Sequence, residues 1–248
     1  DYRLDRMNLR ELTIAFFMHF SIQIYIALAA VSAVASIRWA EGVLPLIASV
    51  VAVMFIYPVA WYLLHRFVLH GQFLYKSKHT AKVWKRIHFD HHRNPHDLKV
   101  LFGALHTTLP TIALISAPAG YLIGGRAGAA AALTAGLLVT CFYEFCHCIQ
   151  HLNTTPKSKI LRRMKRLHLQ HHFHDENANF GITNFVPDRI FGTYVSSPIN
   201  LPQSPTVFNL GYTGLEVRKY PWVARLTTDI DEKEAAENGI SRRKPKRA

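Results

Sequence analysis

The sequence predicts an all-α membrane protein with four transmembrane helices in two hairpins and a cytosolic, histidine-rich helical cap. Three observations carry this prediction. Half of the 248 residues are hydrophobic and only 18% are charged, the hydrophobic residues lie in long uncharged stretches, and the basic residues are concentrated between those stretches. The same composition excludes a disordered chain, a collagen and a disulfide scaffold.

Four apolar stretches can cross a bilayer, which needs roughly 20 apolar residues in a helix. Three of them lack Asp, Glu, Lys and Arg throughout, and the fourth is uncharged from Ala127 to Tyr143 and continues with apolar residues towards His151. They form two pairs, and the members of each pair are joined by a very short connection. Pro110 and Pro118 interrupt the third stretch, so we expect a kink there or a segment that enters and leaves on one side. The predicted spans are residues 12–37, 43–65, 100–123 and 127–150.

The positive charges predict an orientation. The formal net charge is +13, yet the two short connections carry one arginine each, Arg38 and Arg126. Most of the other basic residues lie between the second and third spans or after the fourth. Because positive loops stay inside, both long polar segments and both termini are expected in the cytosol. Basic residues spread as loop anchors, rather than gathered in one module, argue against nucleic-acid binding.

The chain reads as one integral membrane domain over residues 1–248. Residues 66–99 and 151–228 are expected to form the cytosolic cap, and residues 229–248 a polar tail with a disordered basic end. The first apolar stretch is longer than that of a cleavable signal peptide, so we expect it to be a membrane span.

Ten of the 15 histidines fall into four groups that follow the second and fourth spans. Their spacings are H-x4-H, H-x2-HH, H-x3-H and H-x2-HH. On an α-helix, residues three and four apart share a face, as a chelating site requires. His65 and His70 are five apart, which predicts a helix end or a local distortion, or ligation of two different ions. The ten are His65, His70, His88, His91, His92, His147, His151, His168, His171 and His172.

A single histidine is most simply a hydrogen-bonded residue near a helix end, but these groups recur at matched distances after two span ends. We therefore predict a metal site at the cytosolic mouth of the helices. Ten imidazoles exceed the ligands of one ion, so the site should hold two ions, and neutral nitrogen ligands suit iron and zinc alike. The remaining five are expected to make local polar contacts: His19, His79, His96, His106 and His174.

These motifs resemble the fatty acid hydroxylase and sterol desaturase superfamily of integral membrane di-metal oxidoreductases, over about half of the chain. Fatty acid 2-hydroxylases are the most similar group. Residues 65–70 read H-R-F-x-x-H, residues 179–181 read N-F-G, and residues 188–193 read D-x-x-F-G-T, as in that group. Two departures are Glu144 in place of an aspartate before the third box and Pro187 in place of a tryptophan.

The resemblance implies that the ten histidines hold two iron ions, which use O2 to hydroxylate a C–H bond of a membrane lipid, most simply its acyl chain. No acidic, basic or nucleophilic side chain can attack such a bond. Zinc could replace iron in purified protein but would not turn over. The eukaryotic relatives carry a cytochrome b5 domain with an H-P-G-G motif, which this sequence lacks. Electrons are therefore expected from a separate cytochrome b5-like protein or a ferredoxin with its reductase.

Four residues near the boxes are candidate catalytic residues: Tyr143, Glu144, Asp175 and Asn179. Tyr143 lies one helical turn before His147 and could hydrogen-bond the substrate, or it could be an interfacial aromatic. Glu144 and Asp175, together with Asp90, could fix imidazole tautomers or could be ordinary solvated carboxylates. Asn179 belongs to the N-F-G element.

Two alternatives remain beside acyl-chain hydroxylation. The same di-iron chemistry could act on a sterol, a sphingoid base or a bacterial aminolipid, by hydroxylation or desaturation. The chain could instead be a non-catalytic zinc-binding membrane protein, such as a carrier or a sensor. A carrier should place its ligands near the bilayer midplane, whereas the paired histidines here end the spans and the triplets lie outside them.

Overall fold

The computed structural model describes residues 3–199 and 201–226. Every regular element in these ranges is a helix, and the single backbone bridge joins Arg3 to Asp97. The predicted helical fold is therefore confirmed for the described part of the chain, whereas the predicted polar tail, residues 229–248, lies outside it.

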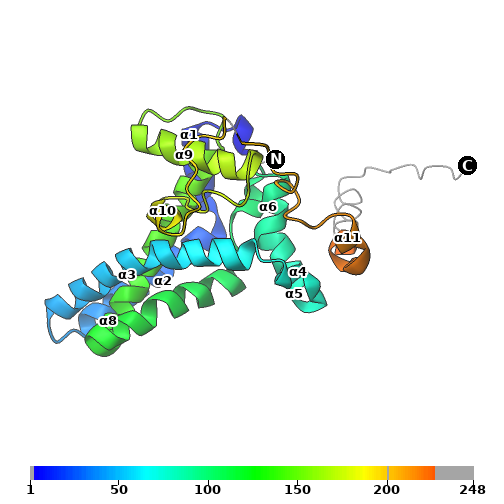
Figure 1. Cartoon of the computed structure of the whole chain (residues 1–248). Coiled ribbons are helices and arrows are strands. Elements are labelled where there is room, and N and C mark those ends of the chain that lie inside the picture. The colour runs from blue at the N-terminus through cyan, green and yellow to red at the C-terminus, as the bar shows by residue number, and fades with distance from the viewer. Residues whose placement is uncertain (1–2, 200, 227–248) are drawn as a thin grey trace, which may run out of the picture.

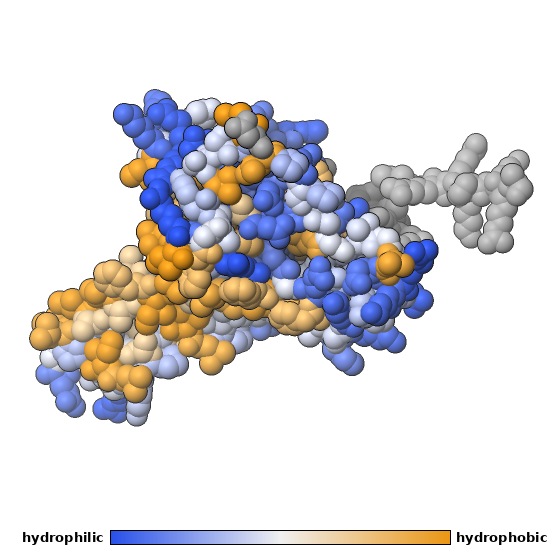
Figure 2. All heavy atoms as spheres, viewed as in Figure 1, coloured by the Kyte–Doolittle hydropathy of each residue, from blue (hydrophilic) through white to orange (hydrophobic). Residues whose placement is uncertain are grey.

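Three long helices, α2 (Phe20–Arg38), α3 (Val43–Leu63) and α8 (Leu105–His151), fill one half of the molecule (Figure 1). Both α2 and α3 pack against α8. Figure 2 shows that the surface of this half is mostly apolar, whereas the other half is mostly polar. Three helical segments are long and apolar enough to cross a membrane: Phe20–Arg38, Val43–Leu69 and Leu98–His151.

Helix α8 is bent back on itself. Gly124 and Gly125 leave helical geometry, and Gly125 has a φ of 57°, which glycine adopts without a steric cost. The two arms then touch through their backbones, because a Cβ on Gly120 would lie 2.2 Å from the carbonyl oxygen of Gly128. The predicted spans 100–123 and 127–150 correspond to these two arms. Pro110 and Pro118 lie inside helix, so the bend falls at the glycines and not at the prolines.

The predicted first span, residues 12–37, is wrong at its start. Asn8 and Glu11 form a capping box that begins a separate helix, α1 (Leu9–Met18). The backbone then turns extended at His19, whose Nδ1 accepts a hydrogen bond from the Ser21 N–H and so caps α2. A similar break follows α7 (Leu98–Leu101), so the helix predicted from residue 100 begins at Leu105.

The polar half is built from short helices, among which η2 and η3 are π-helices. Helix α9 is the exception in length and is amphipathic: Met164 and Leu167 pack against Cys146 and Phe185, while its basic side chains lie on other faces. The elements are η1 (Leu4–Arg6), η2 (Leu64–Leu69), α4 (Phe73–Lys76), α5 (Lys78–Trp84), η3 (Lys85–Phe89), α6 (Asp90–Arg93), α9 (Lys159–Phe173), α10 (Val186–Ile190) and α11 (Leu215–Lys219).

Candidate metal centre

The ten histidines selected from the sequence come together in two groups of five. Within each group, one nitrogen of every imidazole lies within 4.8 Å of one nitrogen of every other. Almost all of these side chains are buried. The first histidine group is His65, His70, His88, His92 and His171, and the second histidine group is His91, His147, His151, His168 and His172.

Each triplet is divided between the two groups. His88 and His92 join the first histidine group, but His91 between them belongs to the second. The triplet on α9 is divided in the opposite sense. Its middle member, His171, belongs to the first group, whereas His168 and His172 belong to the second. Each group thus takes four histidines from one half of the chain and a fifth from the other half.

The first pair of histidines is brought together by the π-helix η2. The backbone N–H of His70 donates to the carbonyl oxygen of His65 at 3.1 Å, the i→i+5 bond of a π-turn. Residues five apart consequently lie on the same side of the helix, with the two Nε2 atoms 3.3 Å apart. The structure contains both the local distortion and the helix end that the spacing predicted, because η2 ends at Leu69 with His70 as its C-cap, and both side chains enter the same group.

The nitrogen positions fit metal ligation. Two ligands about 2.1 Å from one ion, at 90–110° to each other, stand roughly 3.0–3.4 Å apart. The Nε2 atoms of His91 and His147 are 3.1 Å apart, and those of His151 and His168 are 2.9 Å apart. Buried nitrogens without any hydrogen-bond partner in the described chain would be costly unless a cation bound them. They include the Nε2 atoms of His92, His171 and His172.

Protonation does not resolve these unpaired nitrogens. Burial, reinforced by the charge that neighbouring imidazoles would carry, lowers the pKa of His171 to about 3. Burial likewise lowers the pKa of His88 well below its usual value. At neutral pH both imidazoles are neutral, which is the form that binds a metal ion.

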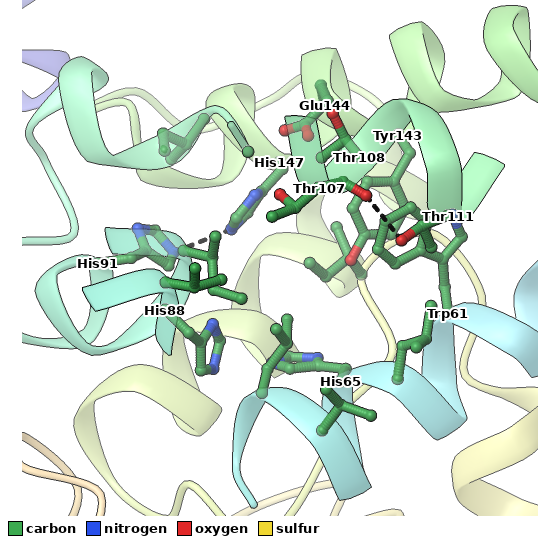
Figure 3. Close-up of a pocket in the computed structure, with 18 of the residues that line it drawn as sticks. Trp61, His65, His88, His91, Thr107, Thr108, Thr111, Tyr143, Glu144 and His147 are labelled. Atoms are coloured by element: carbon green, nitrogen blue, oxygen red, sulfur yellow. Dashed lines mark hydrogen bonds between the residues drawn. The ribbon is translucent and has the colours of Figure 1, made fainter. Parts of the chain in front are cut away.

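A cavity of about 250 Å³ adjoins both histidine groups. Figure 3 shows histidines of both groups reaching it from one side and Trp61 and Tyr143 from the other. Most of the remaining lining is aliphatic, and three threonines of α8 add hydroxyl groups. The histidines in its wall are His65, His88, His91, His147, His168 and His172.

A second cavity of about 520 Å³ lies beside the first, between α3, the second arm of α8 and residues 180–184. Its outer lining includes Met54 and Phe142, which are 55% and 60% exposed on the apolar half of the molecule. Trp61, Tyr143 and Ile182 line both cavities. These three side chains therefore form the wall between an apolar surface opening and the cavity at the histidines.

The structure brings two of the four candidate catalytic residues into the cavity wall. Tyr143 and Glu144 line it, and they lie about one helical turn before His147 on α8. Asp175 instead accepts hydrogen bonds from the N–H and the amide of Asn177. The buried amide of Asn179 bonds to the backbone of Val195, which makes it a loop anchor.

The hydrogen-bond partner of the Asp90 carboxylate among the described residues is Lys85 and not an imidazole. Both carboxylate oxygens of Asp90 lie 2.7 Å from the Nζ of Lys85, across the π-helix η3. Sequence reasoning also missed Trp61, although it stands one helical turn before His65, and the cavity threonines Thr107, Thr108 and Thr111. The clustering of the three threonines in an otherwise apolar stretch was the sequence signal that could have identified them as cavity residues.

Residues 50–193 match the model of the fatty acid hydroxylase family. A dihydroceramide fatty acyl 2-hydroxylase of Arabidopsis thaliana is 32% identical over 133 residues, which cover 53% of this chain and 54% of that protein. A ceramide very long chain fatty acid hydroxylase of Saccharomyces cerevisiae is 28% identical over 149 residues, 57% of this chain and 36% of that protein.

The solved structure of full-length scs7p, in which only the hydroxylase domain is visible, has a TM-score of 0.59 at 23% identity. The likeness covers 81% of this chain and 71% of that one, and it shows a shared fold. The chain spans about half the length of the Arabidopsis relative and less of the yeast one. Because the family model matches more than half of the sequence and includes all ten histidines, the chain belongs to the fatty acid hydroxylase family.

Proposed function

We propose that the protein is an O2-dependent di-iron hydroxylase that inserts oxygen into a C–H bond of a membrane lipid, most simply in its acyl chain and next to the carbonyl. One observation carries the proposal: a largely aliphatic cavity adjoins both histidine groups and shares a wall with a second cavity that opens on the apolar surface. The names of the Arabidopsis and yeast relatives support an acyl chain as the substrate.

The chemistry requires a group that no side chain supplies. Two bound iron ions would provide the reduction of O2 that C–H hydroxylation needs. One oxygen atom would enter the lipid and the other would leave as water, so each turnover consumes two electrons and two protons. The donor we propose is an electron-transfer protein of the cytochrome b5 or ferredoxin type.

The residues of this chain would bind and orient the lipid. An acyl chain enters from the bilayer through the second cavity, passes the wall of Trp61, Tyr143 and Ile182, and lies against the aliphatic lining near the histidines. Water is excluded by the same lining. The phenol of Tyr143 and the carboxyl of Glu144 would hydrogen-bond the polar end of the lipid or carry a proton at the cavity wall.

The chain is an integral membrane protein, and we propose a four-span arrangement for it. The two arms of α8 would each cross the bilayer, joined by the bend at Gly124 and Gly125. Because the connections at the far ends are short and the cap is strongly basic, the positive-inside rule favours a cytosolic metal centre and cytosolic termini. The whole would form one domain.

The proposal is tested with protein purified from iron-supplemented cells. Metal per chain is counted, and the protein is then supplied with native lipids, isotopically labelled O2 and each electron-donor system in turn. We expect two irons per chain and lipids that gain one labelled oxygen, with the fragment masses locating it in the acyl chain.

Two variants sharpen this test. His147→Ala, which changes the second histidine group alone, should lose one of the two irons and the product, whereas His79→Ala, an exposed histidine outside both groups, should keep both irons and the product. Two tightly held zinc ions with no oxidised lipid, even after iron reconstitution with a working donor, would instead favour a non-catalytic zinc protein.

A further inference from the structure

Two histidines of the first group are oriented by one short loop. The Nδ1 of His171 lies 2.8 Å from the carbonyl oxygen of Ala178, and the Nδ1 of His65 lies 2.6 Å from that of Phe180. A carbonyl oxygen can only accept a hydrogen bond, so each Nδ1 carries the proton. The Nε2 of each ring is then the free lone pair, which is the atom a metal ion would bind.

The direction of each carbonyl is set from the other side of its own peptide plane. A planar peptide points its C=O and its N–H in opposite directions, so fixing the N–H fixes the carbonyl. The peptide that carries the Phe180 carbonyl is held by its Gly181 N–H, which donates to Asp188 Oδ2 at 2.9 Å. The peptide that carries the Ala178 carbonyl is held by its Asn179 N–H, which donates to the carbonyl of Thr193 at 2.9 Å.

Asp188 is the centre of this arrangement. Its carboxylate is fully buried and accepts two further hydrogen bonds, from the Phe180 N–H at 2.7 Å and from the Thr193 hydroxyl at 2.8 Å. Its backbone carbonyl also accepts from the N–H of Thr193. One carboxylate thereby joins the loop of residues 178–181 to the segment of residues 188–193.

Asp188 packs so closely against the loop that residue 181 has no room for a side chain. A Cβ on Gly181 would lie 2.7 Å from Asp188 Oδ2 and 2.3 Å from the carbonyl of Asn184. Asn179 adopts a φ of 54°, a conformation that asparagine tolerates, and its amide brackets Val195. The close packing at Gly181 and the hydrogen bonds of Asn179 therefore hold the loop in the conformation that directs the two carbonyls at the imidazoles.

The second histidine group has no counterpart of this support. In residues 3–199 and 201–226, the Nδ1 atoms of four of its members have no hydrogen-bond partner. These members are His91, His151, His168 and His172. The two groups consequently differ in how their imidazoles are oriented, because the hydrogen bonds of the Asp188 carboxylate lead to His65 and His171 in the first group.

We propose that Asp188 is a positioning residue for one of the two metal ions. It fixes the peptides of residues 178–181, which set the tautomer and orientation of His65 and His171, and so raises the metal affinity of the first histidine group without touching the ion. The inference rests on the two-metal centre of the proposed function. Partners of metal-binding histidines typically contribute about 10- to 100-fold in metal affinity.

The test is metal binding by full-length chain that has been stripped with a chelator and kept in detergent. Co²⁺ is titrated anaerobically, with its visible absorption and the bound metal per chain as readouts, so hydroxylation is not needed. Asp188→Asn replaces one acceptor oxygen by an NH2 group, which can only donate. In one orientation this group faces the Gly181 N–H, and in the other it faces the Phe180 N–H and the Thr193 hydroxyl, so at least one hydrogen bond is lost. We expect the wild type to bind two ions and Asp188→Asn to bind one of them about 10- to 100-fold more weakly.

Matched variants show that the effect belongs to the first group. His88→Ala should weaken the same ion, and the double variant with Asp188→Asn should still hold the other one. Glu216→Gln, which removes a carboxylate bonded to Tyr75 elsewhere in the cap, should bind two ions as the wild type does. Thr193→Val should weaken the same ion less than Asp188→Asn, and Thr193→Ser, which keeps the hydroxyl, should restore it. The threonine variants serve also if Asp188→Asn fails to fold.

If Asp188→Asn and Thr193→Val both bind two ions with the affinities of the wild type, the inference is overturned, although the metal centre itself stands. Equal weakening of both ions would overturn it too, because it would mean that Asp188 supports the fold and not one group. A wild-type chain that binds no ion would overturn the proposed function itself, and the inference with it.

Discussion

The ring of Trp61 stacks on the ring of Tyr143, with centroids 5.3 Å apart and ring planes inclined at 17°. The two residues come from α3 and from the second arm of α8, so the stack joins the helices that flank the second cavity. The Trp61 Nε1 is buried without a hydrogen-bond partner in the described chain. In the proposed function, an acyl chain would pass this pair on its way from the second cavity to the histidines.

Trp61→Ala should merge the two cavities and let the acyl chain lie in several registers. A displacement of about 1 Å from the reacting geometry costs on the order of 100-fold in rate. We expect hydroxylation next to the carbonyl to fall about 10- to 100-fold and products at other carbons to appear, with metal content unchanged. Mass spectrometry of the product lipids measures this. Met54→Leu, at the mouth of the second cavity, should leave the product pattern as it is, and an unaltered pattern in Trp61→Ala would refute the partition.

The divided triplets predict which histidine substitutions act on the same ion. His88→Ala and His171→Ala each remove a member of the first histidine group, although the two residues lie on different halves of the chain. Their double variant should keep one ion. His88→Ala combined with His91→Ala should lose both, although these residues are only three apart. Metal analysis of the single and double variants decides the point, and the opposite pattern would mean that each triplet serves one ion.

Removing the metal should lower stability, because an ion that binds only the folded chain stabilises it by mass action. The effect is about 4 kcal/mol at a free metal concentration about 1,000 times the Kd. A chelator should therefore lower the melting temperature of the detergent-solubilised protein. Zn²⁺ should restore the melting temperature but not lipid hydroxylation, since zinc has no redox chemistry. Identical melting curves with and without chelator would contradict this expectation.

Gly181→Ala should disturb the first histidine group through the loop. Its Cβ would meet the Asn184 carbonyl and Asp188 at distances that no real contact shows, and relief by backbone movement typically costs about 1–3 kcal/mol. We expect a lower melting temperature and weaker binding of one ion. Gly42→Ala is the matched control, because its nearest neighbour would be 3.9 Å away and its backbone is extended. Equal behaviour of the two variants would argue against a tightly fitted loop.

The sequence predicted the parts of the fold that depend on local pattern. Uncharged runs marked α2, α3 and both arms of α8, since a helix that crosses lipid cannot carry unpaired charges. The histidine spacings marked all ten members of the two groups, because residues three and four apart share a helical face. The boundaries were less certain: the apolar run from residue 12 gave no sign that His19 would end one helix and cap the next.

The parts that the sequence did not predict depend on contacts between distant segments. The spacing of His88, His91 and His92 does not indicate that the middle residue belongs to a different group from the outer two. That division depends on the packing of α6 against α9, which brings the ring of His91 to His172 and the ring of His92 to His171. The sequence left Asp90 open between orienting an imidazole and being an ordinary solvated carboxylate, and the structure instead places its carboxylate against Lys85. The stack of Trp61 on Tyr143 likewise exists only after two helices have packed.

Because His91 and His171 are exchanged between the two groups, any metal binding there would depend on the packing of the two halves of the chain against each other. Before α9 has docked, the second group contains only His91, His147 and His151, and the first lacks His171. Each half of the chain carries five of the ten histidines, but neither half can form either of the two groups alone. Under the proposed function, a chain whose two halves have not packed together would hold no complete metal site and would therefore have no hydroxylase activity.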